Sequence, residues 1–141
     1  DDALLDALLD GNRTDAMARA TELAAGTPQE ANLIYGTSKR ALARWVRRNA
    51  ASADWAGAGI PLNAVAPGVV LTPMTADLTA TEEERAALIA QVPMPLNGFF
   101  GPEAVADLLV WLTAEANAHL CGQVIFIDGG SDVVIRGDST W

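Results

Sequence analysis

The sequence predicts part of an α/β fold built on a parallel β-sheet, and two features carry this prediction. Helical patterns alternate along the chain with apolar runs at residues 60–66 and 123–127, which are typical of strands buried on both faces of such a sheet. Each run stops at a Pro-Gly or Asp-Gly-Gly turn. Because sheets average about five or six strands, we expect several strands of this one to lie outside the sequence given.

Residues 1–31 are predicted to form two short helices. The first ends at Gly11 and carries an apolar stripe at helical spacing, made of Leu4, Leu5, Leu8 and Leu9. The second runs from a cap at Thr14 to Gly26. A third and longest helix is expected from about residue 34 to about residue 53.

The second half of the chain alternates strand, helix and strand. After the first strand, Thr81 and Glu84 have capping-box spacing and predict a helix to about Gln91. Pro102 suits the first position of a further helix, which is expected to end near Asn117. The second strand follows, and residues 131–141 are expected to form a tail.

The composition excludes several classes of function. Half of the 141 residues are hydrophobic, which argues against disorder. Eighteen acidic and nine basic residues give a net charge of −9, whereas a nucleic-acid binder needs a basic surface. The one cysteine, Cys121, is too few for an internal disulfide or a thiolate metal site, and it favours a reducing, cytoplasmic location. Proline and glycine interrupt the uncharged run at residues 55–76, so we expect no membrane segment.

Tyr35 and Lys39 are the candidate catalytic residues. They stand four apart at the start of the long predicted helix, which puts the phenol and the ammonium on one face, one turn apart. A free phenol loses its proton only at about pH 10, and a neighbouring cation favours the phenolate. Such a pair is able to accept a proton from an alcohol or give one to a carbonyl. The same spacing also arises as a chance surface pair.

Three motifs in a fixed order extend the evidence beyond this pair. They are YGTSK at residues 35–39, LNAVAPG at 62–68 running into VVLT, and GQVIFIDGG at 122–130. Together they resemble the C-terminal half of the short-chain dehydrogenase/reductase family, from about residue 32 to residue 130. The resemblance implies the last two strands, with their helices, of a Rossmann-like doubly wound parallel sheet. It also implies an oxidoreductase that interconverts a secondary alcohol and a ketone with NAD or NADP.

The resemblance also assigns roles to site residues. Tyr35 would be the acid/base, and Lys39 would favour its phenolate and hydrogen-bond the nicotinamide ribose. The turn after the first strand would lie at the edge of the sheet where such folds bind ligands. In that turn the Val70 backbone and the Thr72 hydroxyl would hold the nicotinamide carboxamide or a nearby phosphate. The cofactor-binding residues implied in this way are Tyr35, Lys39, Pro67, Gly68, Val70 and Thr72.

Several parts of the family's site have no counterpart in the sequence. The glycine-rich nucleotide loop, the catalytic serine and the residue that selects NAD or NADP would belong to the half outside it. No serine stands between Asp1 and Ile34, so we expect the serine just before Asp1. Residues 1–31 would then be a helical insertion, and residues 32–141 the C-terminal half of a single dinucleotide-binding domain. The insertion resembles the bacterial 3α-hydroxysteroid dehydrogenase/carbonyl reductase subgroup, which implies a homodimer joined through the last helix and strand.

Residues 73–101 would form the mobile lid over the substrate. The large apolar side chains proposed to contact substrate are Met74, Leu78, Met94, Phe99 and Phe100. They suit an apolar substrate such as a steroid or an aromatic carbonyl compound. The same side chains would equally serve to pack the lid against the core, and some of them would suit a dimer contact.

Two other functions stay open on the sequence alone. A 3-oxoacyl thioester reductase is compatible with the apolar lid. A non-catalytic scaffold or interaction fragment is the alternative if the chain acts alone, because the nucleotide-binding half is not in the sequence.

Overall fold

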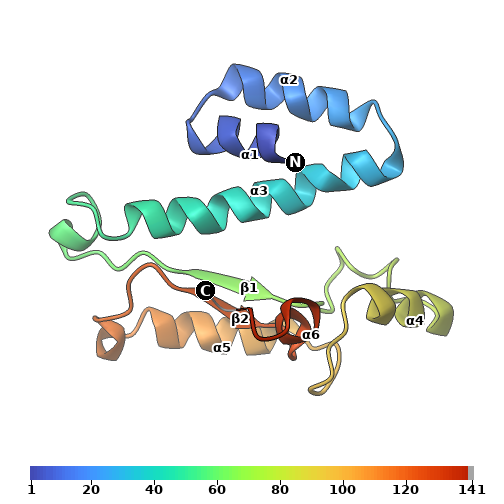
Figure 1. Ribbon diagram of the computed structural model, residues 1–141. Helices are drawn as coiled ribbons and strands as arrows, with labels where there is room; N and C mark the ends of the chain where they lie inside the picture. The colour runs from blue at the N-terminus through green and yellow to red at the C-terminus, as the bar shows by residue number, and fades with distance from the viewer. Residues whose placement is uncertain (140–141) are drawn as a thin grey trace. The chain divides into compact units, whose positions relative to one another are not determined.

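The computed structural model describes residues 1–139 as two compact units, shown as ribbons in Figure 1. The first unit comprises Asp1–Asn63 with Cys121–Gln123. The second comprises Ala64–Leu120 and the described chain from Val124 onward. The first unit is helical, whereas the second holds the β-sheet and further helices.

Three α-helices and a 3₁₀ turn form the first unit: α1 (Asp2–Leu9), α2 (Arg13–Ala24), α3 (Pro28–Asn49) and η1 (Ala56–Ala58). The α1 and α2 helices lie together on one side of α3 (Figure 1). Their apolar faces meet in a buried cluster of Leu4, Ala16 and Leu23. The predicted stripe on the first helix is confirmed for Leu4 and Leu5, which are 2% and 1% exposed, whereas Leu8 remains 38% exposed.

Local capping explains where the helix ends differ from the prediction. The cap of α2 is Asn12 and not Thr14, since the Asn12 side chain accepts the Asp15 N–H at 3.2 Å. The α3 helix begins at Pro28 and not near residue 34, because Thr27 and Glu30 form a capping box there. It ends at Asn49, four residues before the predicted end.

The capping box of α3 depends on the charge of Glu30. The Oε2 atom of Glu30 accepts the Thr27 N–H at 2.7 Å and the Thr27 hydroxyl at 2.8 Å. The backbone hydrogen bond from Thr27 lowers the pKa of Glu30 most, followed by the hydroxyl, with a smaller Coulombic contribution from Arg19. A carboxylate in the first turn also interacts favourably with the helix dipole.

We expect the contribution of Glu30 to stability to disappear on acidification. Because its pKa is lowered in the folded state, this contribution is complete above the unfolded glutamate value of about 4.3 and is lost as the pH falls through the folded value. Urea unfolding of the wild type and of Glu30→Gln between pH 7 and pH 3 measures it. The two midpoints should converge on acidification, and a difference that stays constant with pH would contradict the assignment.

The second unit contains a parallel pair of strands, β1 (Ala64–Pro67) and β2 (Val124–Ile127). Their register sets Ala64 opposite Val124 and Pro67 opposite Ile127. The predicted parallel pairing is confirmed, although β1 starts four residues later than predicted and β2 one residue later. The strands are half-buried and not buried on both faces, and Phe126 is 47% exposed. A two-stranded sheet has too few neighbours to cover both faces.

The remaining helices of the second unit are α4 (Glu82–Gln91), α5 (Pro102–Leu112), η2 (Glu115–Asn117) and α6 (Ser131–Arg136). The capping box predicted at Thr81 is confirmed. The helix predicted to end near Asn117 breaks after Leu112 and resumes as the 3₁₀ turn η2. The predicted tail begins with α6, and residues 140–141 lie outside the described chain. No helix within residues 1–139 is both long and apolar enough to cross a bilayer.

Candidate active site

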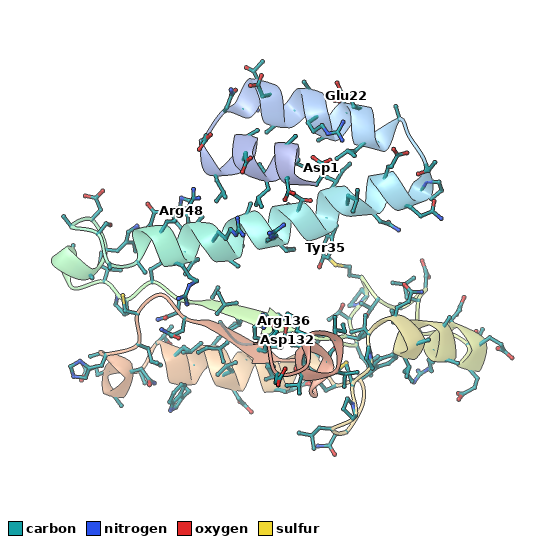
Figure 2. All side chains as sticks on the ribbon, viewed as in Figure 1. Asp1, Glu22, Tyr35, Arg48, Asp132 and Arg136 are labelled. Carbon is teal, nitrogen blue, oxygen red and sulfur yellow. The ribbon has the colours of Figure 1, made fainter. Side chains whose placement is uncertain are left out.

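Tyr35 and Lys39 lie one turn apart on α3, in the first unit. The Lys39 Nζ atom stands 5.4 Å from the centre of the Tyr35 ring, and the Tyr35 side chain is 71% exposed. Figure 2 shows Tyr35 projecting from the side of α3 that faces away from α1 and α2. The phenol is therefore available to a reactant while a cation stands beside it.

Ser38, which belongs to the same motif, is already engaged by its own helix. Its hydroxyl donates to the carbonyl oxygen of Tyr35 at 2.8 Å. This bond agrees with the interpretation of Ser38 as a packing residue and not as a proton donor to a reactant.

In the second unit, the chain turns at the carboxyl end of β1. The Gly68 N–H donates to the carbonyl oxygen of Ile127 at 3.0 Å and so extends the pairing with β2 by one bond. A Cβ atom on Gly68 would come within 2.9 Å of both the Asp128 Cα and the Met94 Sδ. Only glycine allows the chain after Pro67 to approach the end of β2 this closely.

The segment after this turn pairs with the far end of the predicted lid. The Leu71 N–H donates to the Phe100 carbonyl oxygen at 2.8 Å, and Phe100 returns its N–H to Val69 at 3.5 Å. Backbone groups alternate in direction along an extended chain, so the Val70 N–H points away from Phe100. Within residues 1–139 neither this N–H nor the Thr72 hydroxyl has a hydrogen-bond partner. Both are donors open to a ligand at the edge of the sheet.

The residues predicted to contact substrate differ widely in exposure. Met74 is 90% exposed and Leu78 is 54% exposed. Phe99 and Phe100 are half-buried, and Phe100 bridges to Val70. Met94 is only 6% exposed, and its Sδ accepts the N–H of Val69 at 3.3 Å. Packing between the ends of the two strands thus accounts for Met94, whereas Met74 and Leu78 are open to a ligand.

We expect Met94→Leu to destabilise the protein by about 2 kcal/mol. The two side chains have similar volumes, so the packing change alone costs less than about 1.5 kcal/mol. Leucine has no acceptor for the amide of Val69, which is 8% exposed, and an unpaired buried N–H costs about 1–3 kcal/mol. Urea unfolding measures the effect, with the exposed Met74→Leu as the matched control. Equal stability of the two variants would show that the sulfur bond contributes nothing.

Asp128 is a structural residue of this edge that sequence reasoning missed. Its carboxylate accepts the N–H of Gly130 at 2.9 Å and the N–H of Asp132 at 2.7 Å. On α6 the carboxylate of Asp132 forms an ion pair with Arg136 at 2.6 Å, and both residues are labelled in Figure 2. A cavity of about 260 Å³ at the ends of β1 and β2 is lined by the charged side chains Asp128, Asp132 and Arg136 and by the apolar side chains Phe126 and Ile135. The sequence feature that indicates this role is an acidic residue directly before a Gly-Gly turn, where its carboxylate is able to accept the following backbone N–H groups.

The structure thus groups the predicted site residues in two sets. Tyr35 and Lys39 share one helix face of the first unit, and Pro67, Gly68, Val70 and Thr72 share one turn of the second. Within residues 1–139, no group of three or more histidine, cysteine, aspartate or glutamate side chains is arranged to hold a metal ion.

Comparison with known proteins supplies the family. The family model described as enoyl-(acyl carrier protein) reductase matches residues 15–132. The 3-alpha-hydroxysteroid dehydrogenase/carbonyl reductase of Comamonas testosteroni is 36% identical over 122 residues, which cover 86% of this chain and 46% of that protein. The chain belongs to the short-chain dehydrogenase/reductase family. The resemblance predicted from the three sequence motifs is therefore confirmed.

Two further members of the short-chain dehydrogenase/reductase family are similar to this chain. The 3-oxoacyl-(acyl-carrier-protein) reductase of Thermotoga maritima is 38% identical over 106 residues, covering 74% of this chain and 39% of that protein. The crystal structure of the 3-alpha-hydroxysteroid dehydrogenase from Pseudomonas sp. B-0831, complexed with NADH, matches with a TM-score of 0.78 and 32% identity.

This structural match covers 96% of the present chain and 50% of the crystallised one. It confirms that the two strands and their helices form part of a Rossmann-like fold. The chain spans about half the length of the first of these relatives and half that of the crystallised enzyme.

Proposed function

We propose that the protein carrying this chain is an NAD(P)-dependent oxidoreductase that interconverts a secondary alcohol and a ketone. The observation that supports it most is the exposed phenol of Tyr35 with the Lys39 ammonium one turn away, in a chain of the short-chain dehydrogenase/reductase family. The NADH complex of the Pseudomonas relative supports the same class of cofactor.

In this proposal Tyr35 moves the proton. Its hydroxyl gives a proton to the carbonyl oxygen of a ketone, or takes one from an alcohol in the reverse direction. Lys39 would place its positive charge beside the phenolate and would hydrogen-bond the ribose of the cofactor. Bound nicotinamide supplies the hydride chemistry.

The turn after β1 fits a nicotinamide by the chemistry of its donors. Within residues 1–139, the Val70 backbone N–H and the Thr72 hydroxyl have no hydrogen-bond acceptor. A carboxamide oxygen or a phosphate oxygen accepts hydrogen bonds from such donors. Pro67 and Gly68 would hold this turn at the carboxyl end of β1, the side on which parallel α/β sheets bind ligands.

The proposed substrate is an apolar ketone or alcohol such as a steroid. Support comes from the exposed Met74 and Leu78 and from the name of the Comamonas relative. A 3-oxoacyl thioester is the second candidate, and the similarity to the Thermotoga reductase favours it. Phe99 and Phe100 would contribute apolar surface to either substrate, and Met94 would support the lid from inside.

The proposal includes a homodimer joined through α5 and β2. Support comes from large apolar side chains exposed on these two elements, namely Leu109, Val110, Trp111 and Phe126. The organisation of residues 1–31 as an insertion ahead of the tyrosine helix and the cytoplasmic location expected from the composition stay predictions.

Nucleotide binding and turnover test the function directly. The protein expressed from its full reading frame is titrated with NADH and NADPH by fluorescence, then assayed with a steroid ketone and a 3-oxoacyl thioester. We expect saturable binding of at least one nucleotide and faster reduction of the steroid. Preference for the thioester would support the second candidate. Absence of nucleotide binding would contradict the proposal and favour a scaffold.

A further inference from the structure

Thr75, which the sequence analysis did not single out, holds the turn that contains Val70 and Thr72. Its Oγ1 lies 2.7 Å from the Val70 carbonyl oxygen and 3.0 Å from the Thr72 nitrogen. The Thr72 carbonyl oxygen is 3.1 Å away from the same hydroxyl and also accepts the Thr75 N–H at 3.0 Å. One side chain thus contacts three backbone groups of this turn.

The Thr75 hydroxyl cannot donate to all of these groups, so its single proton must be assigned to one of them. A threonine hydroxyl has one proton to donate and two lone pairs. The shortest contact assigns the proton to the Val70 carbonyl, while the Thr72 N–H donates to the hydroxyl oxygen. The hydroxyl therefore bridges an acceptor and a donor, and it fixes the chain direction on both sides of Leu71.

This bridge leaves the two donors proposed for the cofactor, the Val70 N–H and the Thr72 hydroxyl, unpaired within the described part of the chain. The Val70 carbonyl and N–H point to the same side of the extended chain, and Thr75 occupies only the carbonyl. The backbone N–H of Thr72 donates to the hydroxyl oxygen of Thr75. The proton of the Thr72 hydroxyl is not used in this bridge and remains available to a ligand. The Val69 carbonyl and the Leu71 N–H bond to the backbone of Phe100, and the Val69 N–H donates to the Met94 Sδ.

We propose that Thr75 is a positioning residue for cofactor binding, which acts by holding the Val70 N–H and the Thr72 hydroxyl in place. The inference rests on the proposed function, because it assigns these two donors to the nicotinamide cofactor. Thr75 would act only through these two donors, because its own hydroxyl is already bonded to the Val70 carbonyl and the Thr72 N–H. Its hydroxyl already orders the turn in the free protein, so less conformational entropy is lost when the cofactor binds.

The backbone of Thr75 is held in turn by the start of the lid. The hydroxyl of Thr79 donates to the Thr75 carbonyl oxygen at 2.9 Å, and Thr79 is 6% exposed. The Arg85 Nε on α4 donates to the Thr79 carbonyl oxygen at 2.8 Å. Thr79 thus stabilises the same segment but, within residues 1–139, forms no hydrogen bond with Val70 or Thr72, and it provides a matched control.

The test compares Thr75→Val, Thr75→Ser and Thr79→Val in the protein expressed from its full reading frame. Valine keeps the shape and removes the hydroxyl, whereas serine restores it. For Thr75→Val we expect the KM and Kd of the preferred nucleotide to rise about tenfold, the effect of losing one hydrogen bond of about 1.4 kcal/mol, with kcat unchanged. Thr75→Ser should bind within about twofold of the wild type, because it keeps that bond, and Thr79→Val should lose thermal stability without a change in KM.

Three outcomes would overturn the inference: an unchanged KM in Thr75→Val, no rescue by serine, or an equal rise of KM in Thr79→Val, which would indicate general loosening. If Thr75→Val does not fold, Thr75→Ala takes its place in the same comparison. Amide hydrogen exchange at Thr72, which needs no nucleotide, should accelerate in Thr75→Val and stay slow in Thr75→Ser. If the Thr72 amide exchanges faster in Thr75→Val but the wild type binds no nucleotide, the hydroxyl bridge is confirmed and the proposed function is refuted. If the Thr72 amide exchanges equally slowly in Thr75→Val and the wild type, the bridge itself is refuted.

Discussion

Tyr35→Phe is expected to lower kcat by about 10²–10⁴-fold, the usual contribution of a positioned acid/base, while nucleotide affinity is retained. The substitution removes one oxygen from a ring that stays in place on α3. Since the side chain is 71% exposed, the loss of the hydroxyl leaves no buried group unpaired. Stability should therefore stay within about 0.5 kcal/mol of the wild type.

Steady-state turnover, nucleotide titration and thermal unfolding of the same preparation measure this prediction. Ser38→Ala is the matched control, because it removes another hydroxyl of the motif, one that donates only to the Tyr35 carbonyl. We expect it to keep most of the activity. Retained turnover in Tyr35→Phe would remove Tyr35 from the acid/base role, and a parallel loss of folding would show that the effect is structural.

Gly129→Ala is expected to destabilise the protein by about 2–5 kcal/mol, the sum of backbone strain and overpacking. Gly129 has a φ of 61°, in the region that disfavours a side chain. A Cβ atom there would also come within 2.8 Å of the Leu96 carbonyl oxygen and 3.2 Å of the Met94 Cβ. The Leu96 N–H already donates to the Gly129 carbonyl at 2.9 Å, so the two backbones have no room to separate.

Gly98→Ala separates the two contributions. Gly98 has nearly the same φ, 64°, but a Cβ atom there meets nothing within 4 Å. This variant should therefore lose only the backbone term, about 1–2 kcal/mol. Urea unfolding of both variants gives the difference. An equal loss of unfolding free energy in the two variants would show that the backbone at Gly129 and Leu96 moves apart at little energetic cost.

Features that depend on neighbours in the sequence were the most predictable. The capping box at Thr81 is such a local feature and is confirmed. The parallel pairing of the two apolar runs is also confirmed, but its prediction rests on the alternation of helices and strands along the chain. The capping box at Thr27 has the same spacing and starts α3 at Pro28, six residues before the predicted start near residue 34. The α6 helix was missed because it is six residues long and begins where the Asp128 carboxylate accepts the Asp132 N–H.

One part of the candidate site could be predicted from the sequence and another part could not. The Tyr35 and Lys39 pair follows from helix periodicity, since residues four apart share a face. The bridge made by Thr75 joins residues only three and five positions away. It was still not predicted, because a threonine in an irregular segment has several equivalent local partners. The path of the backbone selects among them.

The sequence by itself determined the family, the parallel strand order and the spacing of the phenol and the ammonium, because these depend on local patterns and motif order. Only the tertiary structure decided that Met94 is buried against Gly68 and Gly129 while Met74 is 90% exposed. Both are methionines of the predicted lid, and nothing local distinguishes them. The physical reason is the pairing of strands 60 residues apart, which brings the turns after β1 and β2 together and leaves a gap that one flexible thioether fills.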